Sequence, residues 1–117
     1  MEVFAQDSVP MSNIARELVG SAYGVGVCLL FVDAPPGRGP SLHKHPYEEI
    51  FIVTEGEAKF FGASGERVVR AGEVVIVPAE EPHGFTNTGD GPLKQIDIHV
   101  SPRFETEWLR EGRPTSA

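Results

Sequence analysis

Short runs of apolar residues, each ended by glycine, proline or another turn-forming residue, are the main pattern along this chain of 117 residues. The 13 glycines and 10 prolines are spread along the chain rather than gathered in one region. Short runs with frequent turn signals are typical of an all-β sandwich or barrel. The expected strands are 22–32, 49–54, 57–62, 66–70, 73–77, 83–87 and 93–100.

Little of the sequence has a helical pattern. The tail from Ser101 is the exception, because Ser101 is a suitable N-cap and Pro102 would occupy the first helical position. These signals predict a short C-terminal helix that ends before Gly112. A weaker helical turn is expected at residues 12–18.

Two of the expected strands are apolar on both faces, namely EIFIV at 49–53 and EVVIV within 73–77. A barrel wall that faces water should instead alternate apolar and polar residues. The second face of these strands is therefore expected to pack against another surface. A symmetric copy of the same chain is the simplest partner, so the pattern predicts a homodimer.

The composition fits one ordinary globular domain, expected over 1–117 with a barrel core at about 22–100. Hydrophobic residues make up 40% of the chain and charged residues 23%, near the averages for soluble proteins. The longest apolar stretch, residues 24–32, is too short to span a bilayer, so we expect a cytoplasmic protein. The net charge of −7, without a Lys/Arg cluster, argues against nucleic acid or anionic membranes as partners.

Candidate chemistry is concentrated around the pair His43 and His45. The two histidines are two residues apart, so on an extended strand both imidazoles project to the same side. Glu49 would lie ~13 Å further along an unbroken strand, and a bend at Pro46 is needed to bring it back. His83 begins another expected strand and could approach from there. We therefore predict one divalent metal ion bound by these three histidines and Glu49.

The spacing of these residues resembles the first motif of the cupin superfamily. That motif is a Gly, five residues, His, one residue, His, three or four residues, Glu, six residues and Gly. This sequence fills every position, with Gly37, His43, His45, Glu49 and Gly56. The resemblance supports the first three metal ligands.

The second cupin motif matches with one departure. Gly72, Pro78, His83 and Asn87 have the expected intervals, but Glu80 stands where the family has an inner glycine. A residue other than glycine adopts a left-handed backbone at a cost of ~1–2 kcal/mol. The departure therefore concerns the shape of the turn more than the ligand His83.

The resemblance implies a double-stranded β-helix, or jelly-roll barrel, with the metal inside one mouth, and it implies frequent homodimers. Three imidazoles and one carboxylate suit Fe, Mn, Ni, Co or Zn as the divalent ion. Three neutral imidazoles and one carboxylate around a 2+ ion leave about one positive charge. Such a centre is suited to an oxygen atom of a small ligand.

The wall of the ligand pocket is expected to be apolar. Phe51 and Val53 share a face with Glu49 by the two-residue period, and Phe60 and Phe85 are expected nearby. All four are candidates for substrate contact. Filling the core of a small barrel explains them equally well.

His99 has two interpretations. In residues 93–100, Gln95, Asp97 and His99 share one face, and apolar side chains occupy the other. If the apolar face packs on a partner, His99 enters the barrel and could be catalytic, as a proton shuttle or a hydrogen-bond donor to substrate. We favour a surface position or one behind the metal ligands, because few buried polar groups lack partners.

The favoured function is a metalloenzyme that acts on a small oxygenated molecule, of dioxygenase, decarboxylase or isomerase type. The alternative is a non-catalytic binding or storage cupin in which the metal is structural. A third interpretation, a metal-free epimerase-like cupin with a His/Tyr pair, is disfavoured by the complete ligand set.

Overall fold

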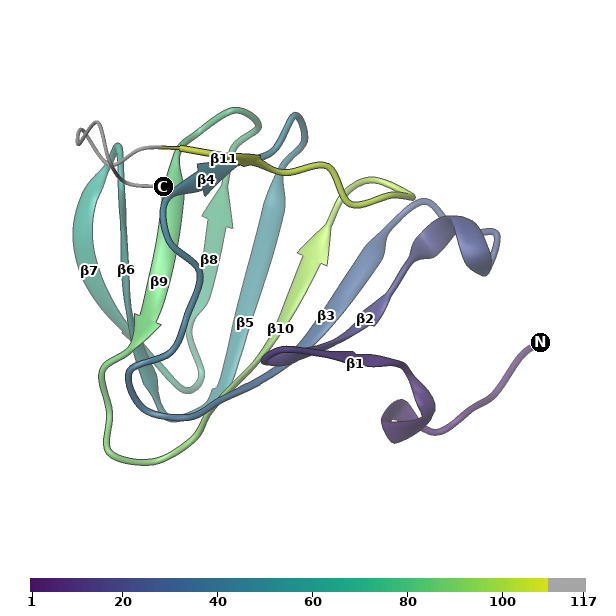
Figure 1. Cartoon of the computed structure of the whole chain (residues 1–117), viewed down its shortest axis with the longest axis horizontal. Coiled ribbons are helices and arrows are strands. Elements are labelled where there is room, and N and C mark those ends of the chain that lie inside the picture. The colour runs from purple at the N-terminus through teal and green to yellow at the C-terminus, as the bar shows by residue number, and fades with distance from the viewer. Residues whose placement is uncertain (110–117) are drawn as a thin grey trace.

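Two antiparallel β-sheets face each other and form a jelly-roll barrel, the double-stranded β-helix expected from the sequence (Figure 1). The computed structural model describes residues 1–109. None of the helices in that range is long and apolar enough to cross a membrane.

The larger sheet has six strands in the order β1-β2-β3-β10-β5-β8. Their bounds are Met11–Ser12 (β1), Ala15–Leu18 (β2), Cys28–Ala34 (β3), Leu93–His99 (β10), Glu49–Glu55 (β5) and Val74–Val77 (β8). Two short 3-10 helices flank β1 and β2, at Gln6–Ser8 (η1) and Gly20–Ala22 (η2).

The smaller sheet has five strands in the order β11-β4-β9-β6-β7. Their bounds are Glu107–Trp108 (β11), His43–Lys44 (β4), His83–Asn87 (β9), Glu57–Gly62 (β6) and Gly65–Arg70 (β7). The chain passes from this sheet to the larger one between β4 and β5.

The core lies between the two sheets and is made by alternate residues of the strands. On β5, Phe51 and Val53 point inward and are each 1% exposed, whereas Ile50 and Ile52 point outward. The cluster is completed from both sheets by Ala15, Val32, Ala34, Ala58, Phe60, Val69, Val77, Phe85 and Leu93. This alternation fixes which side chains of each strand enter the barrel.

Strand register brings four polar side chains to one end of the barrel. In the larger sheet, Glu49 at the start of β5 pairs with His99 at the end of β10. In the smaller sheet, His43 on β4 pairs with His83 at the start of β9. Figure 1 shows β4 and β11 at this end of the molecule.

The predicted C-terminal helix is wrong over the described part of the chain. Residues 101–109 contain no helix, and β11 pairs with β4 instead, placing Trp108 opposite His43. The Trp108 ring packs against the His43 ring, with 5.0 Å between the ring centroids. The end of the predicted helix, at 110–112, lies outside the described residues.

The helical turn expected at 12–18 is also wrong. Residues 11–18 form a β1–β2 hairpin, which turns at Asn13 with φ of 56°. Asparagine tolerates this left-handed conformation better than most residues, which suits it to the turn.

Candidate metal centre

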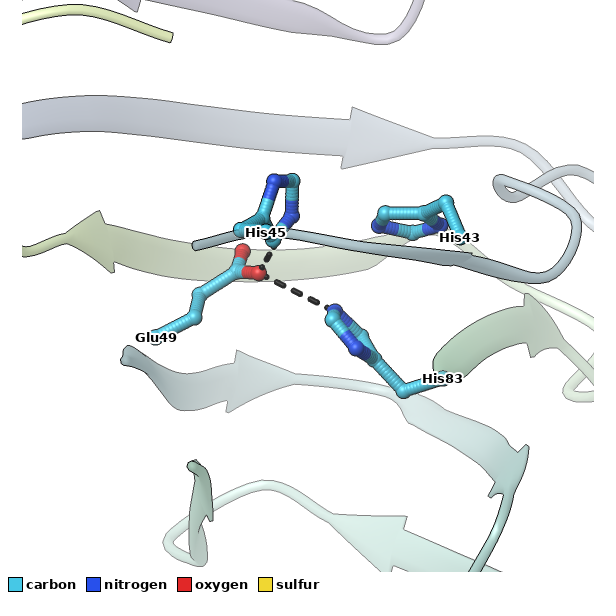
Figure 2. Close-up of side chains that lie close together, drawn as sticks. All are labelled: His43, His45, Glu49 and His83. Atoms are coloured by element: carbon cyan, nitrogen blue, oxygen red, sulfur yellow. Dashed lines mark hydrogen bonds and ion pairs between the residues drawn. The ribbon is translucent and has the colours of Figure 1, made fainter. Parts of the chain in front are cut away.

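Four side chains from three segments meet inside one end of the barrel (Figure 2). We call His43, His45, Glu49 and His83 the candidate metal centre. One donor atom from each lies within 4.8 Å of the other three. The residues are 6%, 3%, 2% and 4% exposed, respectively.

The expected bend before Glu49 is present. Residues 46–47 form a bend between β4 and β5, and the chain changes sheets there. As a result, Glu49 Oε1 lies 3.1 Å from His45 Nε2, although four residues separate them in sequence. Glu48 is exposed, as alternation from Glu49 predicts.

Backbone carbonyls fix the orientation of all three imidazoles. Each Nδ1 lies at hydrogen-bond distance from a carbonyl oxygen, so Nδ1–H donates and Nε2 keeps its lone pair. The pairs are His43 with Ser41 (2.7 Å), His45 with Glu105 (2.8 Å) and His83 with Glu81 (2.9 Å). This is the tautomer in which a histidine binds a metal through Nε2.

The contacts around Glu49 suit a cation. With Nδ1 protonated, the unprotonated Nε2 atoms of His45 and His83 each lie 3.1 Å from Glu49 Oε1. His45 Nε2 is fully buried and has no aligned hydrogen-bond partner in the described part of the chain. Two electron-rich atoms so close together repel each other unless a positive charge lies near both. Donors held 2.0–2.2 Å from one ion would be ~3 Å apart, so the site fits a divalent metal.

The pKa values of these donors reflect their burial and their close contacts with one another. Burial raises the pKa of Glu49, but the close contacts with His45, His83 and His99 outweigh burial and hold that pKa well below its usual value. Burial lowers the pKa of His43 to about 4. Burial also acts to lower the pKa of His83, but its contact with Glu49 raises it overall.

His99 is buried inside the barrel, so the surface position considered for it is wrong. It is 3% exposed, and Nε2 lies 2.9 Å from Glu49 Oε2. The Tyr47 hydroxyl lies 2.6 Å from His99 Nδ1 and accepts a hydrogen bond from the Glu105 N–H at 3.2 Å. His99 thus lies directly behind the candidate ligand Glu49. A position behind the metal ligands was the second one considered from the sequence.

Glu80 occupies the left-handed turn that the cupin motif assigns to glycine. Its φ is 69°, so the turn keeps its shape without glycine. The Glu80 N–H donates to the His45 carbonyl at 2.7 Å, and its carboxylate pairs with Lys44 at 3.1 Å. The turn before His83 is thereby joined to the segment that carries the other histidines.

A cavity of about 370 Å³ leads to the candidate metal centre. Phe51 and Phe85 line it, whereas Val53 does not and belongs to the core. Phe60 instead lines a larger groove of about 430 Å³ near β7 and β8, which reaches only His83 of the four donors. The smaller cavity is therefore the one suited to a ligand of the metal.

Asp97 contributes a carboxyl group to the wall of that cavity. It is 2% exposed, and Gln95 Nε2 donates to its Oδ1 at 2.9 Å. Burial, with the nearby charge of Glu49, raises the pKa of Asp97 well above its usual value. The group is therefore held toward its neutral form, which can donate a hydrogen bond.

Some residues around the site were not predicted from the sequence. Tyr47 lies on the two-residue period that runs from His45 to Glu49, and that period could have indicated that its side chain enters the barrel. Trp108, assigned above to a helix, lines the cavity beside His43. Glu105 acts through its backbone, which no sequence pattern reveals.

Comparison with known proteins identifies a family. Residues 30–99 match the family model of the cupin domain. The uncharacterized protein MJ1618 of Methanocaldococcus jannaschii is 33% identical over 93 residues, a region that covers 77% of this chain and 74% of that protein.

Solved structures share the barrel. An uncharacterized conserved protein with a double-stranded β-helix domain from Klebsiella pneumoniae subsp. pneumoniae MGH 78578 superposes with a TM-score of 0.75 at 19% identity, over 92% of this chain and 90% of that one. Recombinant oxalate oxidase in complex with glycolate gives a TM-score of 0.70 at 27% identity. That match covers 80% of this chain and 53% of the oxidase.

Proposed function

Because the chain belongs to the cupin domain family, we propose that it binds one divalent metal ion at the candidate metal centre and acts there on a small oxygenated molecule. One observation carries the proposal. Three imidazoles held by backbone carbonyls turn their Nε2 atoms toward one buried carboxylate at the inner end of a cavity. The ion would be Fe, Mn, Ni, Co or Zn.

A divalent metal at this position would supply a Lewis acid and a template for a substrate oxygen. The chain's own residues have separate roles in the proposal. His99 and Tyr47 hold the Glu49 carboxylate in place, and Phe51 and Phe85 exclude water from one side of the cavity. Neutral Asp97 donates a hydrogen bond into the cavity. His99 is close enough to the centre to move a proton, the catalytic role considered from sequence.

The reaction class proposed is that of a dioxygenase, a decarboxylase or an isomerase. Each class needs a ligand oxygen beside a cationic centre in a site with few waters. The fold similarity to oxalate oxidase in complex with glycolate supports a small oxygenated ligand as the starting point for screening.

The alternative is a non-catalytic binding or storage protein with a structural metal. The near-complete burial of the four donors favours it, because structural metal sites are usually closed. The two functions differ in the effect of metal removal. A structural metal raises the melting temperature and leaves no turnover to lose.

The test begins with elemental analysis of protein purified without added metal. Oxygen uptake is then screened over small diketones, catechols and keto acids, with His45→Ala as the inactive comparison. Stoichiometric metal in the wild type but not in His45→Ala supports the proposal. Failure to bind any metal, even after anaerobic addition of Fe(II) or Mn(II), refutes it.

We also propose a homodimer formed through the outer face of the larger sheet. Two apolar rows cross this face by direct strand pairing. The rows are Leu29–Ile98–Ile50–Ile76 and Phe31–Ile96–Ile52–Val74. Val74 and Ile76 are 58% and 69% exposed, an arrangement that favours burial against a second copy.

Light scattering on a sizing column tests the dimer. Ile52→Glu places a charge in the middle of one row and is expected to give a monomer. Val68→Glu changes an exposed valine on the smaller sheet and should leave the dimer intact. A monomeric wild type would refute the proposal. A cytoplasmic location stays a prediction from the sequence, which cell fractionation would check.

A further inference from the structure

The loop between β3 and β4 packs against β9, and this contact places Arg38 at the cavity that leads to the candidate metal centre. Asn87 N–H donates to the Arg38 carbonyl at 2.8 Å, and Gly37 N–H donates to the Asn87 carbonyl at 2.9 Å. A Cβ on Gly39 would lie only 2.0 Å from the Phe85 carbonyl oxygen. The backbone on both sides of Arg38 is therefore fixed.

The Arg38 side chain is oriented by the β1–β2 turn. Its Nη2 donates to Asn13 Oδ1, and both residues line the cavity that ends at the candidate metal centre. No carboxylate among residues 1–109 lies within 4.0 Å of the Arg38 guanidinium nitrogens. A guanidinium carries five N–H donors, so most of its binding capacity is available to a ligand.

Within the described residues 1–109, Arg38 is the one Lys or Arg that lines this cavity. The lining also holds Glu17 and the candidate ligand Glu49, whereas Asp97 is held toward its neutral form. With a divalent ion bound, the cavity would have two positive points, one at the metal and one at Arg38. A ligand with an oxygen at each point would be drawn to both.

We propose that Arg38, oriented by Asn13, anchors the carboxylate of a small organic acid whose other oxygen group faces the candidate metal centre. This inference rests on the proposed function for the second contact. A carboxylate fits the planar fork of one guanidinium in a two-point contact. The lining offers one arginine and also holds Glu17, so a carboxylate with one negative charge suits the cavity better than a phosphate dianion.

The size of the cavity limits the acid. Its volume of about 370 Å³ is at the lower end of the 300–1,000 Å³ usual for small-molecule sites. Together with Phe51, Phe85 and Trp108 in the wall, this favours a short carbon chain between the two oxygen groups.

The chain contains a built-in reporter for the test. Trp108 is its single tryptophan and lines the same cavity, so fluorescence titration reports ligand entry, and calorimetry checks the result. The probes are succinate, glutarate and adipate, each compared with its monoamide in metal-loaded protein. Protein treated with chelator is titrated with each monoamide and, for comparison, with its neutral diamide. Arg38→Gln, Arg38→Lys and Asn13→Ala are compared with Arg67→Gln, a control outside this cavity.

At least one diacid should bind the loaded wild type about tenfold more tightly than its monoamide, since a charge-assisted contact is lost. In protein treated with chelator, the monoamide should bind more tightly than the diamide. Arg38→Gln should weaken binding of the diacid to loaded protein by about tenfold, and it should remove the preference of chelated protein for the monoamide over the diamide. Arg38→Lys and Asn13→Ala should retain part of the affinity, and Arg67→Gln all of it.

Three results would overturn the inference. They are an unchanged preference in Arg38→Gln, no binding of any acid in either form, and tighter binding of inorganic phosphate than of the monoamides to chelated protein. Metal binding is measured separately on each variant. If no metal binds, the proposed function fails, while the chelated protein still tests the contact with Arg38.

Discussion

The substitution Gly39→Ala probes the contact between the β3–β4 loop and β9. An alanine Cβ would lie 2.0 Å from the Phe85 carbonyl oxygen, whereas ordinary contact begins at 3.4 Å. The loop must therefore move away by more than an ångström. That movement would lengthen both backbone hydrogen bonds to Asn87 and displace Arg38 from the cavity.

The expected loss follows from these contacts. Two weakened hydrogen bonds cost about 0.5–1.5 kcal/mol each. Placing alanine at the φ of 154° of Gly39 adds about 1–2 kcal/mol. The free energy of unfolding should fall by about 2–5 kcal/mol, a large part of the 5–15 kcal/mol typical of a domain.

A matched control lies two residues away. Gly37 also has a left-handed backbone, with φ of 85°, but nothing lies within 4 Å of a Cβ built there. Gly37→Ala should therefore cost only the conformational strain of about 1–2 kcal/mol. Urea unfolding, followed by Trp108 fluorescence and circular dichroism, measures both variants. Equal losses in the two variants would refute the close approach of the loop to β9.

Three further predictions concern protonation and strain. Affinity for Mn(II) or Co(II) should fall with decreasing pH, because protons compete with the metal for the histidines. His83, whose pKa is raised, should bind a proton first, and His43, whose pKa is about 4, should do so at lower pH. Quenching of Trp108 fluorescence at each pH would measure this, and pH-independent affinity would contradict it. Folded Asp97 keeps its proton where the unfolded chain releases it, so stability should fall as pH rises above its unfolded pKa. At neutral pH, Asp97→Asn should therefore unfold at a higher urea concentration than wild type, and its stability should depend less on pH. An unchanged dependence of stability on pH would show that Asp97 ionises normally. Glu80→Gly relieves a left-handed backbone and loses only an exposed ion pair, so stability should rise by about 0.5–1 kcal/mol in the same assay, and a fall would show the turn to be unstrained.

Most strands could be predicted because their apolar runs end at glycine or proline. The expected strand 57–62 coincides with β6, and 83–87 with β9. The helix expected from Ser101 failed for a tertiary reason. Ser101 Oγ does accept from the Arg103 N–H, as an N-cap would. The chain then extends, because the backbone of Glu105 bonds to His45 and Tyr47.

The metal donors could be found from sequence because their spacing is local or marked by a motif. The sequence also indicated that Gln95, Asp97 and His99 share a face. It could not decide which face enters the barrel, since that depends on the pairing of β10 with β3 and β5. Arg38 was missed because its position follows from a loop contact with β9 rather than from any period.

The backbone of Glu105 has a consequence for how this protein can evolve. Its carbonyl orients His45 and its N–H holds Tyr47, whereas its own side chain takes part in neither bond. Any residue that allows the same backbone path could replace it without disturbing the histidines. Homologues could therefore share this support while differing freely in sequence there, and a comparison based on residue identity would overlook it.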